Sequence, residues 1–493
     1  MEKRKLWVSA LLLALASSVL TLLVATTSSP LYATNFWTDT NIFLTMGRGI
    51  INGLAPYRDL VDQKGPLIFL IYAVAALITD SSFFGAFLLE VASMTAFMLI
   101  GWRIVSLFGE GKLTLASIPL TALVTVCCTA FTQGGSAEEF NLPMLALALY
   151  AAFRRMKEGK DCSCARWMHA AFGFAMGWVF TLKYTDCGLF FGLGRCLVLY
   201  ACYTGGVKAG AVSVLEMFAG FLVIVLPVVL YLLASGALLE CIDTYFIQNI
   251  FVYSGTPMSF AGHIYNALAY LRTQSAVNPA VALLAFAGVA FVSLHALLKH
   301  EKGFLFHAAA APMAAGLLLL FCYWGELAHP YYALAFACLV PLGLTPLGLL
   351  APHMKRAAWL PVSAALVLAA VLPQQLCLAV PLQKVNRADM PQTAFAEIIR
   401  AEENPTLLDI SSLDHGFYLA ADILPDCRYF CVLNANAQAQ QQEIREYLET
   451  GKTLFVVTRY TDPGKRYEKI AEASGVFDLN SPQTYSLYKR VEE

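Results

Sequence analysis

The stretch of the chain that decides the fold is residues 52–67, which read NGLAPYRDLVDQKGPL. Asn52-Gly53 is expected to end an amphipathic helix over residues 41–51, because glycine readily takes the left-handed conformation that closes a helix. Pro56 and Pro66 bracket a rigid turn segment. The segment is rich in charged side chains, and an apolar run follows it at once. We therefore expect a structured polar loop between two helices at a membrane interface.

The whole chain has the composition of a membrane protein. Its 493 residues are 58% hydrophobic and 14% charged, with a mean hydropathy of +0.62, whereas soluble domains carry about 25% charged residues. A soluble fold of this size would lack the charged side chains to cover its surface. The composition excludes an ordinary soluble enzyme and a disordered chain, and the net charge of −1 argues against a nucleic-acid binder.

The charged residues are divided unevenly between two parts of the chain. Of the 33 basic and 34 acidic side chains, 38 lie in residues 1–383 and 29 lie in the much shorter segment 384–493. Such a shift in composition marks a domain boundary. We therefore predict an α-helical multi-pass membrane domain over residues 1–383 and a small soluble α/β domain over residues 384–493.

About 20 apolar residues are needed for a helix to cross a bilayer. The first such run, residues 6–25, is longer than the core of a cleaved signal peptide, which is about 7–15 residues, so we expect an uncleaved anchor. The run 67–78 is short and predicts a helix that lies in the interface over residues 67–79. Eleven spans are predicted: 6–25, 82–107, 113–131, 138–153, 168–182, 186–203, 211–235, 280–298, 304–323, 331–349 and 358–377.

The distribution of basic residues predicts the orientation of these spans. With eleven spans, fifteen basic residues fall on the N-terminal side of the membrane: Lys3, Arg4, Lys5, Arg103, Lys112, Arg154, Arg155, Lys157, Lys160, Arg166, Lys208, Lys299, Lys302, Lys355 and Arg356. Five fall in the opposite connections: Arg48, Arg58, Lys64, Lys183 and Arg272. The positive-inside rule then places the N-terminus in the cytoplasm and the C-terminal domain outside.

Polar residues collect on the predicted outer face, in two long external loops, 28–66 and 236–279, and at helix ends. The acids there are Asp39, Asp59, Asp62, Glu138, Glu139, Asp186, Asp243 and Glu326, and the basic and imidazole groups include Arg58, Lys64, Lys183, Arg272, His263 and His329. A transporter or lipid flippase, the alternative function, would place ionisable groups near the midplane. The candidates there are Glu90, Arg195 and Glu216, which we expect to be buried contacts between helices. A non-catalytic scaffold would leave the acidic loop unexplained.

The first external loop resembles that of the GT-C glycosyltransferases. The residues that carry the resemblance are Asp39, Phe43, Gly53, Pro56, Tyr57, Asp59, Asp62, Lys64, Gly65, Pro66 and Leu67. The pattern is most similar to the bacterial branch resembling protein O-mannosyltransferases and the lipid A aminoarabinose transferase, glycosyltransferase families 39 and 83. Two weaker similarities, in residues 134–140 and in His329-Pro330-Tyr331-Tyr332, extend the resemblance over roughly residues 1–380.

The resemblance implies transfer of a sugar from a polyprenyl-phosphate carrier to an acceptor outside the membrane, by inverting displacement. The acceptor would be a cell-envelope glycan, lipid or protein, and the location the bacterial plasma membrane. Asp39 matches the acid expected to serve as the general base. Lys64 is the first candidate for binding the donor phosphate, followed by Lys183, Arg272 and His329, because a cation must stabilise the departing phosphate.

Four further acids, Asp59, Asp62, Glu138 and Glu139, are candidates for orienting the acceptor or holding a divalent cation. Their oxygens would suit Mg or Mn, and the need for a metal stays open. Each site residue also has a purely structural reading: an N-cap for Asp39, solvated carboxylates for the four acids, a snorkelling lysine for Lys183 and a hydrogen-bonded histidine for His329. Tyr331 and Tyr332 would stack on a sugar or belong to the interfacial aromatic belt.

The C-terminal domain is expected to cap the membrane site or to help select the acceptor. Strands are predicted over Thr406–Ile410, Tyr429–Leu433, Thr453–Thr458 and Thr484–Lys489, and helices over Gln438–Thr450 and 464–474. Cys427 and Cys431 lie close enough in sequence to pair, but the spacing does not decide it. Cys162 and Cys164 are too few for a zinc site.

Overall fold

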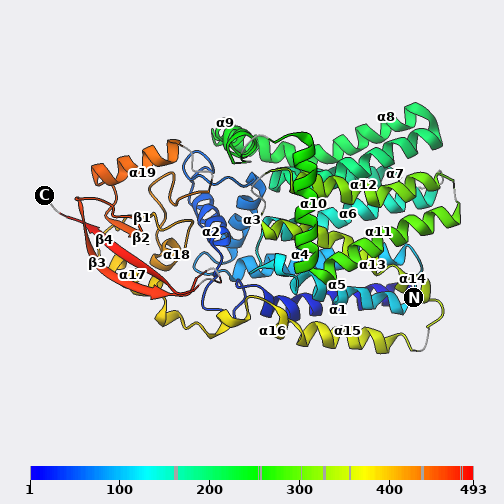
Figure 1. Ribbon diagram of the computed structural model, residues 1–493, viewed down its shortest axis with the longest axis horizontal. Coiled ribbons are helices and arrows are strands. Elements are labelled where there is room, and N and C mark those ends of the chain that lie inside the picture. Colours follow the sequence, from blue (N-terminus) through cyan, green and yellow to red (C-terminus); the bar gives the residue numbers. More distant parts are fainter. Residues whose placement is uncertain are drawn as a thin grey trace.

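A computed structural model describes residues 2–159, 165–253, 255, 258–300, 302–325, 329–354, 357–434, 438–477, 479 and 481–491. It is a bundle of long helices with a small sheet domain at one end, and the N-terminus lies at the other end (Figure 1). This architecture confirms the predicted fold class. Glu326 and the pair Cys162 and Cys164 fall outside the described residues.

All eleven predicted apolar runs are helical. The elements are α1 Glu2–Ala25, α4 Phe84–Ser106, η1 Lys112–Ala116, α5 Ser117–Val126, α6 Ala137–Glu158, α7 Ala165–Leu182, α8 Gly188–Ala234, α11 Pro279–Lys299, α12 Phe304–Cys322, η6 Pro330–Leu339, α13 Val340–Gly343, α14 Pro346–Leu350, α15 Trp359–Val371 and α16 Pro373–Leu376. Two predicted runs share α8, which is kinked at Gly206, where φ is 79°. Among the described residues, seven helical segments are long and apolar enough to cross a membrane, and one of them contains this kinked pair.

Close helix contacts hold the bundle together. A Cβ atom at Gly173 on α7 would collide with the carbonyl oxygen of Met217 on α8, so this contact requires glycine. At the N-terminal end, the Arg103 guanidinium lies 5.2 Å from the ring of Trp7, and Arg154 and Arg103 both lie over the ring of Tyr150. Basic residues predicted for the same side of the membrane are therefore found together, at the end of the bundle where the chain begins.

Shorter elements build the end of the bundle that faces the sheet domain. They are α2 Thr38–Ile51, α3 Pro66–Ile78, η2 Thr129–Phe131, η4 Tyr184–Cys187, α9 Leu238–Cys241, the π-helix η5 Ile242–Tyr253, and α10 Phe260–Val277. The segment 236–279, expected to be a long loop, is therefore mostly helical, and Figure 1 shows α10 running across the other helices. The predicted helix over 41–51 is confirmed within α2, but most of it is buried, including Arg48, because the C-terminal domain covers its polar side.

The C-terminal domain is a four-stranded sheet with helices. Its elements are η7 Val380–Lys384, η8 Arg387–Asp389, α17 Pro391–Arg400, β1 Leu407–Asp409, α18 Phe417–Ala421, α19 Gln438–Thr450, β2 Phe455–Thr458, β3 Tyr467–Gly475 and β4 Gln483–Arg490. The strand order is β1-β2-β4-β3; β1 and β2 are parallel and the other neighbours are antiparallel. In the register, Leu408 pairs with Val456, and Val457 pairs with Leu487.

Two predictions for this domain are wrong. Residues 429–433 are irregular rather than a strand, because side chains and turns take their backbone groups: the Tyr418 hydroxyl, for example, donates to the Phe430 carbonyl at 2.5 Å. Residues 464–474 are mostly strand β3, because pairing with β4 outweighs the helix propensity of their Lys, Glu and Ala residues. Cys427 and Cys431 are both buried and free, so they do not pair with each other.

Candidate active site

Asp39 and Lys64 form an ion pair at the end of the bundle that faces the C-terminal domain. Asp39 lies in the first turn of α2, and Lys64 lies in the loop before α3. Lys64 Nζ donates to Asp39 Oδ2 at 3.0 Å, and both side chains are about 15% exposed. The N-cap of α2 is Trp37, so the capping role considered for Asp39 is wrong. Asp39, the candidate base, and Lys64, the candidate for binding the phosphate, are thus in direct contact.

The loop around Lys64 is held rigidly by its own side chains and by α7. Asp62, which is 4% exposed, accepts a hydrogen bond from the Lys64 backbone N at 3.1 Å. The Tyr57 hydroxyl donates to the Lys64 carbonyl oxygen at 2.6 Å. A Cβ atom at Gly65 would collide with the carbonyl oxygen of Thr181, so the motif glycine is needed for the loop to lie this close to α7.

The electrostatics of this loop keep Lys64 charged. Burial alone would lower the pKa of Lys64, but the carboxylates of Asp39 and Asp62 and the neighbouring Tyr331 raise it well above its usual value. Burial raises the pKa of Asp62 to about 6, although the Lys64 ammonium opposes this shift. The expectation of a solvated Asp62 is therefore wrong, because its carboxylate is enclosed in the loop.

A second lysine–carboxylate pair lies beside the first. Glu138 in the first turn of α6 contacts Lys183, which follows α7, and their side chains are 1% and 10% exposed. The Lys183 and Lys64 Nζ atoms lie 5.6 and 5.8 Å from the centroid of the Tyr331 ring. Lys183 Nζ also lies 3.5 Å from the ring centroid of Tyr332. Two ammonium groups therefore face one pair of tyrosines, in cation–π geometry.

His329 completes this aromatic cluster. Its ring stacks on Tyr331 with the centroids 5.2 Å apart, and its Nε2 lies 2.7 Å from the Tyr253 hydroxyl of η5. Burial and the positive charge of Lys64 lower the pKa of His329. A neutral His329 is better suited to a structural hydrogen bond with Tyr253 than to binding a phosphate as a third cation.

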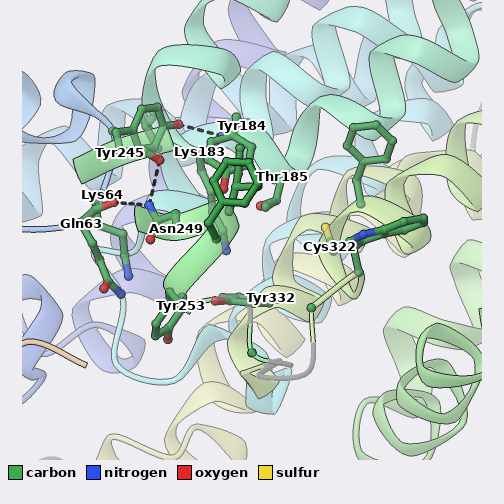
Figure 2. A pocket seen from close by; sticks show the side chains of 18 of the residues that line it. Gln63, Lys64, Lys183, Tyr184, Thr185, Tyr245, Asn249, Tyr253, Cys322 and Tyr332 are labelled. Carbon is green, nitrogen blue, oxygen red and sulfur yellow. Dashed lines mark hydrogen bonds between the residues drawn. The ribbon is translucent and has the colours of Figure 1, made fainter. Parts of the chain in front are cut away.

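A cavity of about 750 Å³ opens next to the two lysines (Figure 2). Lys64, Lys183, Asn249 and Tyr332 form part of its polar lining, and Asn249 is fixed by donating to the Gln63 carbonyl oxygen at 2.8 Å. The rest of the wall is largely apolar and includes Leu182, Ile250, Phe251, Met258, Phe321 and Trp324. The cavity therefore combines two cations with a wall suited to a hydrocarbon chain.

Three other predicted residues are not part of this arrangement. Glu139 is buried but turned away, and its Oε2 accepts a hydrogen bond from the Gly135 backbone N at 2.8 Å. Asp59 pairs with Arg58 at 2.7 Å and accepts a hydrogen bond from the Ala55 backbone N. Arg272 is exposed on α10 and does not line the cavity. The predicted solvation is wrong for Glu138 and Glu139, since both are 1% exposed, and the snorkelling reading of Lys183 is wrong because its ammonium is buried against Glu138.

The candidate metal ligands do not fit a divalent cation in this arrangement. Asp39 is paired with Lys64, Glu138 with Lys183, and Glu139 with a backbone amide. Within the part of the chain that the structure describes, no three His, Cys, Asp or Glu side chains are grouped as a metal site would require.

From the sequence, segment 236–279 with Asn249 and Tyr253 was expected to help form the acceptor cleft, but no role was assigned to its residues, and Asp186 and Asn141 were not expected to be partners. Asn249 and Tyr253 lie in the segment expected to be a loop, and a π-helix has no sequence signal that would have placed them. Asp186 accepts a hydrogen bond from Asn141 Nδ2 at 2.8 Å and is fully buried. The sequence places Asp186 at the predicted outer end of a span, and this was the one feature that could have marked it as a site residue. No feature of the sequence indicated Asn141.

Comparison with known proteins identifies the fold. No protein-family profile and no curated protein matches the sequence. Among solved structures, ArnT from Cupriavidus metallidurans bound to undecaprenyl phosphate is similar with a TM-score of 0.61 and 13% identity, covering 98% of each chain. ArnT in the apo state gives a TM-score of 0.59 and 14% identity over 100% of this chain and 99% of that chain.

A third structure extends the similarity. The Archaeoglobus fulgidus oligosaccharyltransferase in complex with Zn and sulfate has a TM-score of 0.51 and 14% identity, over 91% of this chain and 68% of that chain. At such identities the likeness concerns the fold. The helical bundle and the C-terminal domain therefore share the fold of these structures, which is the GT-C fold.

Proposed function

We propose that this protein transfers a sugar from a polyprenyl-phosphate carrier to an acceptor at the end of the membrane domain where the C-terminal domain lies. The observation that carries the proposal is the pair of lysines, Lys64 and Lys183, each held by a carboxylate at the polar end of a largely apolar cavity. A phosphate with a hydrocarbon chain has the chemistry to match both parts. The undecaprenyl phosphate bound to ArnT supports this class of ligand.

The donor phosphate would bind between the two ammonium groups. Lys64 and Lys183 face the same Tyr331 ring from distances below 6 Å, so one phosphate group would interact with both. A lysine ammonium binds phosphate as a compact point charge. When Lys64 turns to the phosphate, Asp39 loses its partner and becomes available as a base. The hydrocarbon chain would follow the apolar wall of the cavity.

The chemical step would be a single displacement at the anomeric carbon. The acceptor oxygen or nitrogen attacks that carbon from the face opposite the phosphate, and its proton passes to a carboxylate oxygen of Asp39. The bond between the anomeric carbon and the phosphate oxygen breaks, and the electron pair stays on the phosphate. Lys64 and Lys183 stabilise the charge that develops there. Asp39 then returns the proton to solvent.

The arrangement of the basic residues supports one side of the membrane. Arg103 lies over the rings of Trp7 and Tyr150, and Arg154 lies over Tyr150, at the N-terminal end of the bundle, whereas the cavity includes Lys64 and Gly65 from the loop before α3. If the basic end faces the cytoplasm, the site opens to the outside. This orientation, in a bacterial plasma membrane, gives access to glycan, lipid or protein acceptors of the cell envelope.

The test is a transfer assay with the purified full chain in lipid nanodiscs. A panel of undecaprenyl-phosphate-linked sugars is supplied, and release of undecaprenyl phosphate is measured with candidate acceptors present. We expect Asp39→Asn to reduce turnover by about 10²–10⁴-fold, the range for loss of a general base. The matched control is Asp80→Asn, an exposed acid between α3 and α4, which should stay within about twofold of the wild type.

The possible outcomes test the reaction class and the role of Asp39 separately. No release from any donor in the panel would contradict the proposed glycosyl transfer. Full turnover in Asp39→Asn would exclude Asp39 as the base and leave the reaction class intact. Movement of an intact donor across the bilayer without release would instead indicate a flippase.

A further inference from the structure

The C-terminal domain holds the loop that carries Lys64. We propose that Arg428 is a positioning residue for Lys64, so that the C-terminal domain sets the position of the lysine that binds the donor phosphate. The proposal rests on the proposed function, because it needs Lys64 to bind that phosphate. It gives the domain a task in donor binding beyond the capping expected from the sequence.

Arg428 clamps the loop with three hydrogen bonds. Its Nε and Nη2 atoms donate to the carbonyl oxygen of Tyr57 at 3.1 and 2.9 Å. Its own carbonyl oxygen accepts a hydrogen bond from the Val61 backbone N at 3.0 Å. The planar guanidinium presents both donors in a fixed geometry, which a flexible lysine does not. One residue of the C-terminal domain therefore fixes both ends of the turn 57–61.

Tyr57 has a backbone conformation that needs such support. Its φ is 66°, in the left-handed region, which is a strained conformation for a bulky residue. The turn is closed by a hydrogen bond from the Tyr57 backbone N to the Leu60 carbonyl oxygen at 2.7 Å. The Tyr57 ring is fully buried, 5.6 Å from the ring of Phe69. Surrounding contacts, including those of Arg428, must hold this conformation in place.

The clamped turn determines where Lys64 lies. The Tyr57 hydroxyl donates to the carbonyl oxygen of Lys64 at 2.6 Å, and Asp62 accepts a hydrogen bond from the Lys64 backbone N at 3.1 Å. Both backbone polar groups of Lys64 are therefore held by residues of the same loop. A shift of Tyr57 would move the Lys64 ammonium relative to Asp39 and Tyr331, and displacements of about 1 Å matter for reactive groups.

Arg428 acts on the loop and not on the substrate. It does not line the cavity. Its backbone N donates to Glu443 Oε1 on α19 at 3.1 Å, and its guanidinium lies 5.4 Å from the ring of Tyr429. These contacts anchor Arg428 within the C-terminal domain. Its effect on the donor must pass through Tyr57.

The test compares Arg428→Gln and Arg428→Lys with a matched control in the full chain. Arg400→Gln is the control, because Arg400 also donates to backbone carbonyls, those of Ala420 and Ala421, but within the C-terminal domain itself. Three quantities are measured: hydrogen exchange of the amides in residues 57–64, affinity for undecaprenyl phosphate, and turnover at saturating donor. Exchange is measured without ligand, so it reports on the loop whether or not the enzyme is active.

We expect Arg428→Gln to speed exchange at Tyr57 and Val61 and to weaken undecaprenyl phosphate binding by about tenfold, with a smaller change in saturated turnover. Arg428→Lys should recover part of the affinity, because an ammonium still reaches the Tyr57 carbonyl. Arg400→Gln should match the wild type in all three measurements. An unchanged affinity in Arg428→Gln, or an equal loss in Arg400→Gln, would overturn the proposal. If Lys64→Gln itself keeps full affinity, the proposed role of Lys64 fails, and the positioning role fails with it.

Discussion

Two buried clusters of polar groups lie close to α2, and they differ in their access to open space. The first is the cluster of Asp39, Lys64, Glu138 and Lys183 at the cavity. The second lies in the C-terminal domain, where Ser411 Oγ is 2.5 Å from Asp409 Oδ1 and 3.1 Å from His415 Nδ1. The residue types are those of a hydrolase triad, but here the serine, and not the histidine, bridges the other two side chains.

The second cluster is sealed. Asp409, Ser411 and His415 are at most 4% exposed, and the rings of Phe477 and Tyr485 pack on His415. Asp409 also accepts hydrogen bonds from backbone groups, which is what a structural carboxylate does. The cavity cluster, in contrast, borders about 750 Å³ of open space. Access to open space therefore distinguishes the candidate active site at the cavity from the structural network around Asp409.

The largest effect expected on donor binding comes from replacing a cavity lysine. Lys64→Gln and Lys183→Gln should each weaken undecaprenyl phosphate binding by about a hundredfold, because each removes a charged partner of the phosphate and leaves a buried carboxylate unpaired. Ser411→Ala should leave binding and turnover within about twofold of the wild type. Affinity is measured with undecaprenyl phosphate in nanodiscs.

A control lysine tests whether charge alone explains this result. Lys112 also lies over an aromatic ring, 5.8 Å from the centroid of Trp359, but it does not line the cavity. Lys112→Gln should bind undecaprenyl phosphate like the wild type. A large loss in Ser411→Ala would reverse the comparison and make the second cluster functional.

A smaller effect is expected where the two regions meet. The Thr45 hydroxyl of α2 donates to Asp414 Oδ2 of the C-terminal domain at 2.7 Å, and both groups are buried. Thr45→Val leaves the carboxylate without this donor, so the contact between α2 and the domain should lose about 1–3 kcal/mol. The measurement is native-state hydrogen exchange of residues 412–418. Unchanged exchange there would show that Thr45 does not stabilise this contact.

The sequence predicted the helical bundle well because each apolar run carries its own signal. The first-loop motif also singled out Asp39 and Lys64 as candidate site residues, but it did not predict that they form a pair. They are 25 positions apart, and the chain between them passes through the turn at Tyr57, where φ is positive. No local pattern encodes a bulky residue with positive φ.

Neighbouring residues show a second limit of sequence reasoning. Glu138 and Glu139 were equivalent candidates, yet they contact Lys183 and the Gly135 backbone N, respectively. Successive residues of a helix point to different sides, so only one of them contacts Lys183, which lines the cavity. The residue at which α6 begins determines which of the two glutamates has this contact. Helix ends are the least certain part of a sequence prediction. Strand β3 was missed for a related reason, since its partner β4 lies outside the local window.

The smallest expected effect is a change in the pH dependence of local stability at the sealed cluster. Burial raises the pKa of Asp409 to about 7, whereas an unfolded aspartate has a pKa near 3.8. Between these values the folded protein holds a proton that the unfolded chain has released, so this group makes the protein less stable as the pH rises. Burial lowers the pKa of His415 to about 4, which contributes in the opposite direction from about pH 4 to 6.5.

Asp409→Asn removes the contribution of Asp409 to the pH dependence of stability and keeps that of His415. From pH 6 to 7, the variant should therefore lose less local stability than the wild type, by about 1 kcal/mol. Hydrogen exchange of the amides in residues 407–418, measured at both pH values in the full chain, reports this difference. The affinity for undecaprenyl phosphate should respond to this change of pH in the same way in Asp409→Asn and in the wild type. The reason is that Asp409, Ser411 and His415 do not line the cavity. An equal pH shift in donor affinity and in local stability would show that the two clusters are coupled through α2, and access alone would no longer explain their difference.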